Sequence, residues 1–348
     1  MTPASIALRP TPHAALRLCV ALLCALLGAP VAAIDAAQLA VVINMNDPVS
    51  YAIGEYYVVR RHLPLVNIIK IRFAPGATTM SEGEFKLLKA EVERQTASHV
   101  QAYALTWAAP YRVECMSITA AFTFGFNRAH CASGCKPTEV NPLFNSSSRE
   151  PYTELGIRPT MSIAARNFED AVALTDRGVA ADGSFPTARA YLLSTTDKAR
   201  NVRAANYPVV AQVLGKRVAS RILRQDVLYG ARDVLFYFTG LAKVAGLETL
   251  GFKPGAVADH LTSYGGMLTD SKQMSALRWL KAGATGSYGT VQEPCNFPQK
   301  FSDPVILVDN YLRGETLLEA YWKSVAMPGQ GIFIGEPLAA PFRPAPTP

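Results

Sequence analysis

The sequence has little charge and no long apolar run after its first thirty-odd residues. Asp, Glu, Lys and Arg together make up only 18% of the 348 residues, while 49% are hydrophobic. A disordered chain would show the opposite balance, so this class is excluded. After residue 33 no stretch of about 18 consecutive apolar residues occurs, which predicts no membrane span in the mature chain. A length of this order suggests one large or two ordinary domains, and we predict a single domain over residues 34–340.

Blocks of like charge are also missing. Removing residues 1–33 takes away two of the 34 basic residues and none of the 27 acidic ones, which leaves a net charge of +5. These charges are dispersed, as on a solvated surface of mixed sign. No basic patch with interleaved aromatic residues is present, so we expect no nucleic-acid partner.

The N-terminus has the features of an export signal. Arg9 and Arg17 lie before and at the start of the apolar run Leu18–Gly28, and small residues follow up to Val31-Ala-Ala33. A basic start, a short apolar segment and a small-x-small end are typical of a secretory signal peptide. We therefore expect residues 1–33 to be removed and the mature chain to be secreted or periplasmic.

Four cysteines remain after this cleavage: Cys115, Cys131, Cys135 and Cys295. An even number in an exported chain favours disulfides, but the sequence leaves the three possible pairings open. A zinc site would need further cysteine or histidine ligands at suitable spacing, and none is present. We predict neither a metal nor a cofactor.

The N-terminal third alternates between strands and helices. Short apolar runs rich in β-branched residues predict strands, and capping residues predict helix starts. The expected strands are 38–46, 66–73 and 100–107, and the expected helices are 51–62 and 81–96. This order predicts an α/β fold with a largely parallel, doubly wound sheet and helices on both faces.

Residues 108–160 break this alternation. They are rich in Gly, Pro, Ser and Asn and contain three of the four mature cysteines. A loop of this length without structure of its own is uncommon in a compact domain, so we expect an irregular insertion held by a disulfide.

The alternation resumes after the insertion. The expected helices are 168–177, 209–223 and 273–282, and the expected strands are 188–194, 233–239, 257–262, 285–291 and 331–334. Ser81 to Glu84 and Thr316 to Glu319 each form a capping box, which predicts that a helix begins there. The proline-rich residues 341–348 are expected to be a disordered tail.

Candidate site residues follow the predicted strands, because ligands of open α/β sheets bind at strand carboxyl ends. The candidate ligand-binding residues are Asn46, Asp47, Thr239, Gly240, Asp259, Gly265, Gly266 and Glu293. For Asp47 the alternative is a helix cap, and for the two adjacent glycines it is a simple turn.

Three residues are candidate catalytic groups. His260 is a possible general base, and Ser263 and Cys295 are possible nucleophiles. The alternatives are a structural histidine that satisfies a backbone group and a disulfide at Cys295, which an oxidising compartment favours.

Several motifs resemble an uncharacterised family of secreted bacterial proteins found in genomes that carry exosortase, a membrane enzyme proposed to sort surface proteins. The motifs are Asn44-Met-Asn-Asp-Pro48, Arg158-Pro-Thr-Met161, Asp259-His-Leu-Thr-Ser-Tyr-Gly-Gly266, Ala282-Gly-Ala-Thr-Gly-Ser-Tyr-Gly-Thr-Val-Gln-Glu-Pro-Cys-Asn296, Leu318-Glu-Ala-Tyr-Trp-Lys-Ser-Val325 and Gly331-Ile-Phe-Ile-Gly-Glu-Pro-Leu338. The resemblance implies an exported protein linked to surface-protein export, with exported surface proteins or peptides as partners. It implies no particular activity.

The order of elements in the C-terminal half is similar, more remotely, to the catalytic domain of gingipain-type cysteine peptidases, which have a caspase-like fold. This resemblance implies a His–Cys dyad, with the histidine near Thr239-Gly240 and the cysteine near Thr262-Ser263. The sequence has no histidine at the first position and no cysteine at the second. We therefore expect an accessory or binding protein. The alternative is a peptidase-like hydrolase with a pocket around His260, Ser263 and Cys295.

Overall fold

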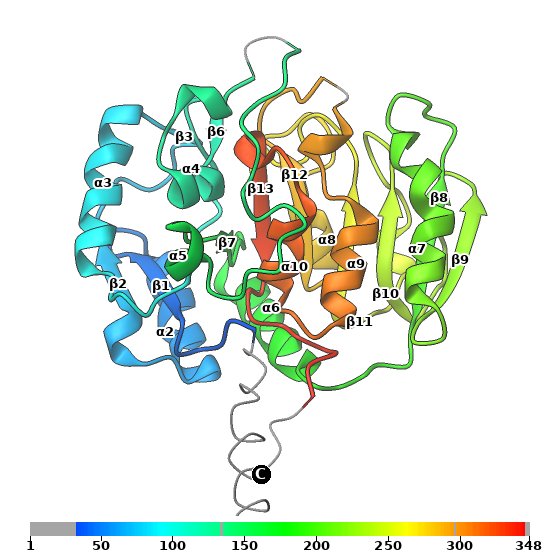
Figure 1. The fold of residues 1–348 in the computed structure, drawn as a ribbon, viewed down its shortest axis with the longest axis horizontal. Helices are drawn as coiled ribbons and strands as arrows, with labels where there is room; N and C mark the ends of the chain where they lie inside the picture. The colour runs from blue at the N-terminus through cyan, green and yellow to red at the C-terminus, as the bar shows by residue number, and fades with distance from the viewer. Residues whose placement is uncertain (1–32, 133–134, 296, 345–348) are drawn as a thin grey trace, which may run out of the picture. The chain divides into compact units, whose positions relative to one another are not determined.

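The computed structural model describes residues 33–132, 135–295 and 297–344. Its central feature is a ten-stranded sheet with helices on both faces (Figure 1). The strands lie in the order β2 (Ile68–Ile71), β1 (Leu39–Asn44), β4 (Ala102–Leu105), β7 (Thr160–Ser162), β13 (Gly331–Gly335), β12 (Gly286–Thr290), β11 (Phe252–His260), β10 (Val234–Thr239), β8 (Arg189–Ser194) and β9 (Ala219–Arg224). The expected α/β class with a largely parallel sheet is confirmed.

The sheet contains a single reversal of direction among its described strands. Every neighbouring pair is parallel except β12 and β13, which are antiparallel and pair Gly286 with Gly335 and Thr290 with Gly331. The strands therefore fall into two groups by the end of the sheet at which their carboxyl ends lie. At one end lie the carboxyl ends of β1, β2, β4, β7 and β13, and at the opposite end lie those of β8 to β12. This separation decides which candidate residues can meet.

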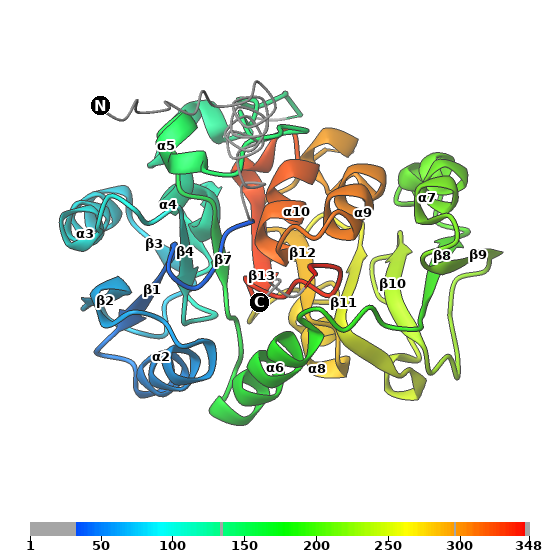
Figure 2. The same ribbon diagram turned by 60° about the horizontal axis from the view of Figure 1, so that its bottom comes forward.

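Two layers of helices cover the sheet (Figure 2). One face carries α2 (Pro48–Arg61), α6 (Phe168–Ala181) and α8 (Leu277–Ala282), and the other carries α3 (Glu82–Gln95), α4 (Ile118–Phe124), α7 (Tyr207–Leu214), α9 (Pro304–Leu312) and α10 (Leu317–Ser324). Because helices cover both faces, the inner strands are shielded from solvent on both sides, and all six residues of β1 and of β10 are buried.

Side-chain caps fix where several helices begin. Asp47 accepts a hydrogen bond from the Val49 amide at the start of α2, and Ser81 accepts one from the Glu84 amide at the start of α3. Thr316 at the start of α10 forms the predicted reciprocal capping box with Glu319. These caps satisfy amides that have no partner within the helix.

The insertion at 108–160 is more regular than we predicted. It contains α4, α5 (Pro151–Leu155) and the short strands β5 (Arg112–Val113) and β6 (Met116–Ser117). β5 pairs with β3 (Thr79–Met80) on one side and with β6 on the other, which forms a separate three-stranded sheet.

Two disulfides involve this insertion and confirm the prediction that disulfides hold it. Cys115 is joined to Cys131 within the insertion. Cys135 is joined to Cys295, which follows β12. The second bond therefore ties the insertion to the carboxyl end of a central strand.

Some predicted boundaries were wrong. We expected one helix over 209–223, but α7 ends at Leu214, where Gly215 adopts a φ of 53° and the chain turns into the edge strand β9. Glycine adopts this left-handed conformation at little cost, which explains the break. The helix expected at 273–282 begins only at Leu277, and the strand expected at 257–262 begins already at Phe252.

The first residues of the expected tail are packed against the domain. Phe342 is buried, with its ring centroid 6.1 Å from that of Tyr311, and Arg343 donates a hydrogen bond to the Ile34 carbonyl. Nearly all of the expected signal peptide, residues 1–32, and the end of the tail, residues 345–348, lie outside the described residues.

Candidate functional site

A buried ion pair lies at the carboxyl ends of β10 and β11. Arg203, in the 3₁₀ segment Asn201–Asn206 that follows β8, places Nη2 2.6 Å from Oδ1 of Asp259. Both residues are buried, and the Ser302 hydroxyl donates to the other oxygen of Asp259. Burial is the largest single influence on the pKa of Arg203 and lowers it, but the Asp259 carboxylate together with nearby tyrosines raises it by more, so this pKa is raised overall. The guanidinium therefore stays charged and is neutralised internally.

The same 3₁₀ segment, together with Arg200 directly before it, closes the ends of the two strands. Arg203 donates from Nη2 to the Thr239 carbonyl, at 3.1 Å. Arg200 donates from Nε to the Thr262 hydroxyl, also at 3.1 Å, and is itself held by Asp197. The Arg200 carbonyl lies so close to Gly240 that a Cβ on this glycine would be 1.9 Å from the carbonyl oxygen. The two strand ends are thus occupied by internal contacts.

A cavity of about 490 Å³ lies beside this cluster, with Arg203 and Ser302 in its wall together with Phe144, Val202 and Phe301. Two buried polar atoms nearby, Nε of Arg203 and Oγ1 of Thr239, have no hydrogen-bond partner among the described residues. The candidates Thr239, Gly240 and Asp259 are therefore brought together, but around an internal arginine.

His260 has the geometry of a structural residue. It is only 2% exposed, the Trp279 indole donates to its Nδ1 at 2.9 Å, and its Nε2 lies 3.1 Å from the Met274 carbonyl oxygen. These partners assign the proton to Nε2. Burial is the main cause that lowers the pKa of His260, to about 3. A neutral imidazole with both nitrogens occupied has no free position for a proton from a nucleophile.

Ser263, Glu293 and Cys295 come together, without His260 among their hydrogen-bond partners. The Ser263 hydroxyl donates to Oε1 of Glu293 at 3.2 Å, and the Cys295 amide donates to the same oxygen at 2.9 Å. The Cys295 sulfur is bonded to Cys135. In this form Cys295 offers no thiolate, because the disulfide uses its sulfur.

The paired glycines allow two segments of backbone to approach each other. Gly266 donates to the Thr290 carbonyl at 2.9 Å, and a Cβ on Gly266 would lie 2.6 Å from the Gly289 carbonyl oxygen. A Cβ on Gly265 would lie 3.3 Å from the Thr262 side chain. The close neighbour of this turn is therefore the end of β12.

Asn46 and Asp47 follow β1 and lie at the opposite end of the sheet from Asp259, because β1 and β11 run in opposite directions. Asp47 caps α2, which is the alternative we considered from the sequence. The Asn46 side chain accepts a hydrogen bond from Arg72 at 3.2 Å. The structure does not bring these two residues to the other candidates.

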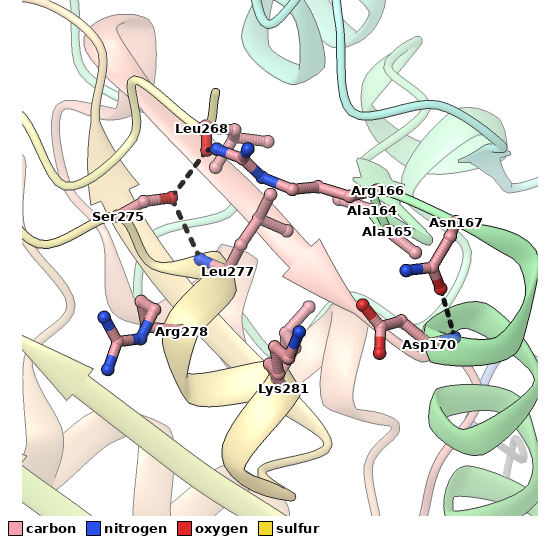
Figure 3. A pocket seen from close by; sticks show the side chains of 11 residues that line it. Ala164, Ala165, Arg166, Asn167, Asp170, Leu268, Ser275, Leu277, Arg278 and Lys281 are labelled. Carbon is pink, nitrogen blue, oxygen red and sulfur yellow. Dashed lines mark hydrogen bonds between the residues drawn. The ribbon is translucent and has the colours of Figure 1, made fainter. Parts of the chain in front are cut away.

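Sequence reasoning missed the residues that line a basic cavity between α6 and α8 (Figure 3). The cavity has a volume of about 290 Å³ and is lined in part by Arg166, Arg278 and Lys281. Arg278 and Lys281 are three residues apart on one helix, a spacing that places them on one face. That spacing was the only sequence signal, since Arg166 joins them through the tertiary fold.

The described residues offer neither a metal centre nor a membrane span. They contain no group of three or more His, Cys, Asp or Glu side chains arranged to hold a metal ion. None of their helices combines the length and the apolar character that crossing a bilayer requires.

No family model matches the chain, and no curated protein matches it. Among solved structures, one described as "Structure of Protease" is similar to this chain, with 12% sequence identity, coverage of 90% of this chain and 80% of that chain, and a TM-score of 0.46. A similarity at this level carries no argument about activity.

Proposed function

We propose that this protein is an exported accessory protein that binds polypeptides without cleaving them and acts in exosortase-linked surface-protein export. One observation carries the non-catalytic part of the proposal. The strand ends at Thr239-Gly240 and Thr262, where the gingipain-like resemblance implies a His–Cys dyad, are closed by hydrogen bonds from Arg203 and Arg200.

The disulfides support export. Bonds such as Cys115–Cys131 and Cys135–Cys295 form and persist in oxidising compartments such as the periplasm or the medium. The motifs that resemble the exosortase-associated family give the proposal its biological setting, with exported surface proteins or peptides as partners.

The rival proposal is a peptidase-like hydrolase. Its support is the hydrogen bond between Ser263 and Glu293, which could orient a hydroxyl nucleophile. It would need a general base, and His260 is buried with both nitrogens occupied. We therefore favour the accessory role.

Proteolysis assays test the non-catalytic part. The full chain, expressed for export so that both disulfides form, is incubated with casein and with a fluorogenic peptide library. We expect no cleavage above that of Ser263→Ala, with Ser147→Ala, an exposed serine, as the matched control. Cleavage by the unmodified chain that Ser263→Ala abolishes and Ser147→Ala preserves would establish the hydrolase instead.

A deletion tests the export part. In an exosortase-carrying bacterium that encodes this chain, we expect its removal to leave sorted surface proteins unattached in the periplasm. Restoring the unmodified chain or Ser263→Ala should both rescue attachment. Normal attachment in the deletion strain would contradict the proposed role.

A further inference from the structure

The cavity between α6 and α8 combines an apolar floor with a cationic rim (Figure 3). Buried Ala164, Ala165, Leu268, Leu277 and Leu280 line it. The exposed side chains of Arg166, Arg278 and Lys281 also line it, with Asp170 as the only acidic residue of the lining. A ligand that fits must therefore present both aliphatic and anionic groups.

The three cations have no acidic partner in the described part of the chain. Neither Arg166 nor Arg278 nor Lys281 takes part in an ion pair there. Other surface arginines of the protein, such as Arg60 and Arg313, do pair with carboxylates. The unbalanced positive charge at the cavity attracts anions.

One of these cations is held in place before any ligand arrives. Nη2 of Arg166 donates to the Thr269 carbonyl at 2.9 Å and lies 3.4 Å from the Leu268 carbonyl. Ser275 also donates to the Leu268 carbonyl and accepts from the Leu277 amide, which fixes this loop against α8. A guanidinium held in this way loses less side-chain entropy when a carboxylate binds.

The cavity continues into a second one. A neighbouring cavity of about 420 Å³ shares Arg166, Leu268, Ser275 and Arg278 with the first and adds Lys243. We call the two cavities together the basic groove. It has cations along its length, so it suits an extended ligand with more than one negative charge.

The lining favours a polypeptide over other polyanions. Neither cavity is lined by an aromatic side chain on which a nucleobase could stack. The apolar floor suits aliphatic side chains, and the arginines suit carboxylates. We infer that the basic groove binds an extended polypeptide segment that carries carboxylates beside aliphatic residues.

This inference deepens the proposed binding role and rests on it, but its test measures affinity, whereas proteolysis and surface attachment test the proposed function. The probe is a fluorescein-labelled decapeptide of alternating glutamate and leucine, and the reference probe has glutamine in place of glutamate. Binding to the full chain is followed by fluorescence anisotropy. We expect the glutamate peptide to bind and the glutamine peptide to bind at least tenfold more weakly, on the order of the effect of losing charged pairs.

Two double variants assign this affinity to the groove. Arg278→Glu with Lys281→Glu should weaken binding of the glutamate peptide by roughly tenfold or more. Lys198→Glu with Lys216→Glu makes the same change in net charge at exposed positions outside the groove, and it should stay within about twofold of the unmodified chain. Thermal melts check folding, and Arg278→Gln with Lys281→Gln replaces the first variant if it unfolds.

Three results would overturn the inference. They are equal binding of the two peptides, equal losses in the two double variants, and binding of phosphatidylglycerol vesicles without binding of the glutamate peptide. Failure of this kind leaves the proteolysis and attachment results unchanged, so it is distinguishable from failure of the proposed function.

Discussion

The buried histidine predicts a specific dependence of stability on pH. His260 has its pKa lowered to about 3 in the folded state, mainly by burial, and the cations Arg203 and Arg200 lower it further. In the unfolded chain its pKa returns to the ordinary value of 6.5. Between these two values the unfolded state binds a proton that the folded state does not. The folded state therefore loses stability as the pH falls from 6.5 towards 3.

The size of the effect follows from the two pKa values. Between pH 7 and pH 5 the unfolded histidine becomes almost fully protonated, while the folded one stays neutral. Linkage gives a loss of about 2 kcal/mol in the free energy of unfolding over this interval. At pH 7 the substitution His260→Gln should itself cost about 1–3 kcal/mol, because the amide only partly replaces the hydrogen bonds to Trp279 and Met274.

Urea denaturation at pH 5, 6 and 7 measures both effects. The difference between the unmodified chain and His260→Gln should shrink by about 2 kcal/mol from pH 7 to pH 5, since glutamine does not titrate. Taking this difference removes the contributions of groups that both proteins share. These include His130, whose pKa burial lowers, and Glu315, whose pKa burial raises and which acts with the opposite sign. A difference that stays constant between pH 7 and pH 5 would refute the assignment of a buried neutral imidazole.

Two further predictions concern the covalent and ionic links around the sheet. Replacing Cys135 and Cys295 by serine opens a link across 160 residues and should cost about 5 kcal/mol in guanidinium denaturation, whereas replacing Cys115 and Cys131, 16 residues apart, should cost about 3 kcal/mol; equal losses would contradict the chain-entropy argument. Asp259→Ala leaves its arginine partner buried without a counter-charge and should cost about 3–5 kcal/mol in the same assay. A loss below about 1 kcal/mol would show that water in the adjoining cavity solvates this arginine.

Local rules predicted the features that depend on neighbouring residues. The capping box at Thr316, the strand at 38–46 and the strand at 233–239 were expected from short patterns and are present. The disulfides were expected from cysteine number and compartment, although their pairing was not. In these cases the interactions act over a few residues or follow from composition.

The remaining features depend on partners that are distant in the sequence. Nothing near Gly331–Gly335 indicates that this strand runs antiparallel to β12. The sequence therefore could not predict that Asn46 and Asp259 lie at opposite ends of the sheet. Arg203 was not among the candidate site residues from the sequence. Its contacts with Asp259 and Thr239 arise only because the segment after β8 lies over the carboxyl ends of β10 and β11 in the fold. The basic groove is likewise assembled from segments that meet only in the folded protein.

The position of the last strand has a consequence for how the protein folds. β13 lies between β7 and β12, so among the strands of the described residues it alone joins the two halves of the sheet. Until residues 331–335 are available, β2-β1-β4-β7 and β12-β11-β10-β8-β9 can form only as separate sheets, each with an uncovered inner edge. Such edges are open to pairing with other chains. Contacts between residues so far apart in sequence also form slowly. A chain truncated before residue 331 should therefore aggregate through these inner edges, and the complete chain should join its two halves in a late folding step.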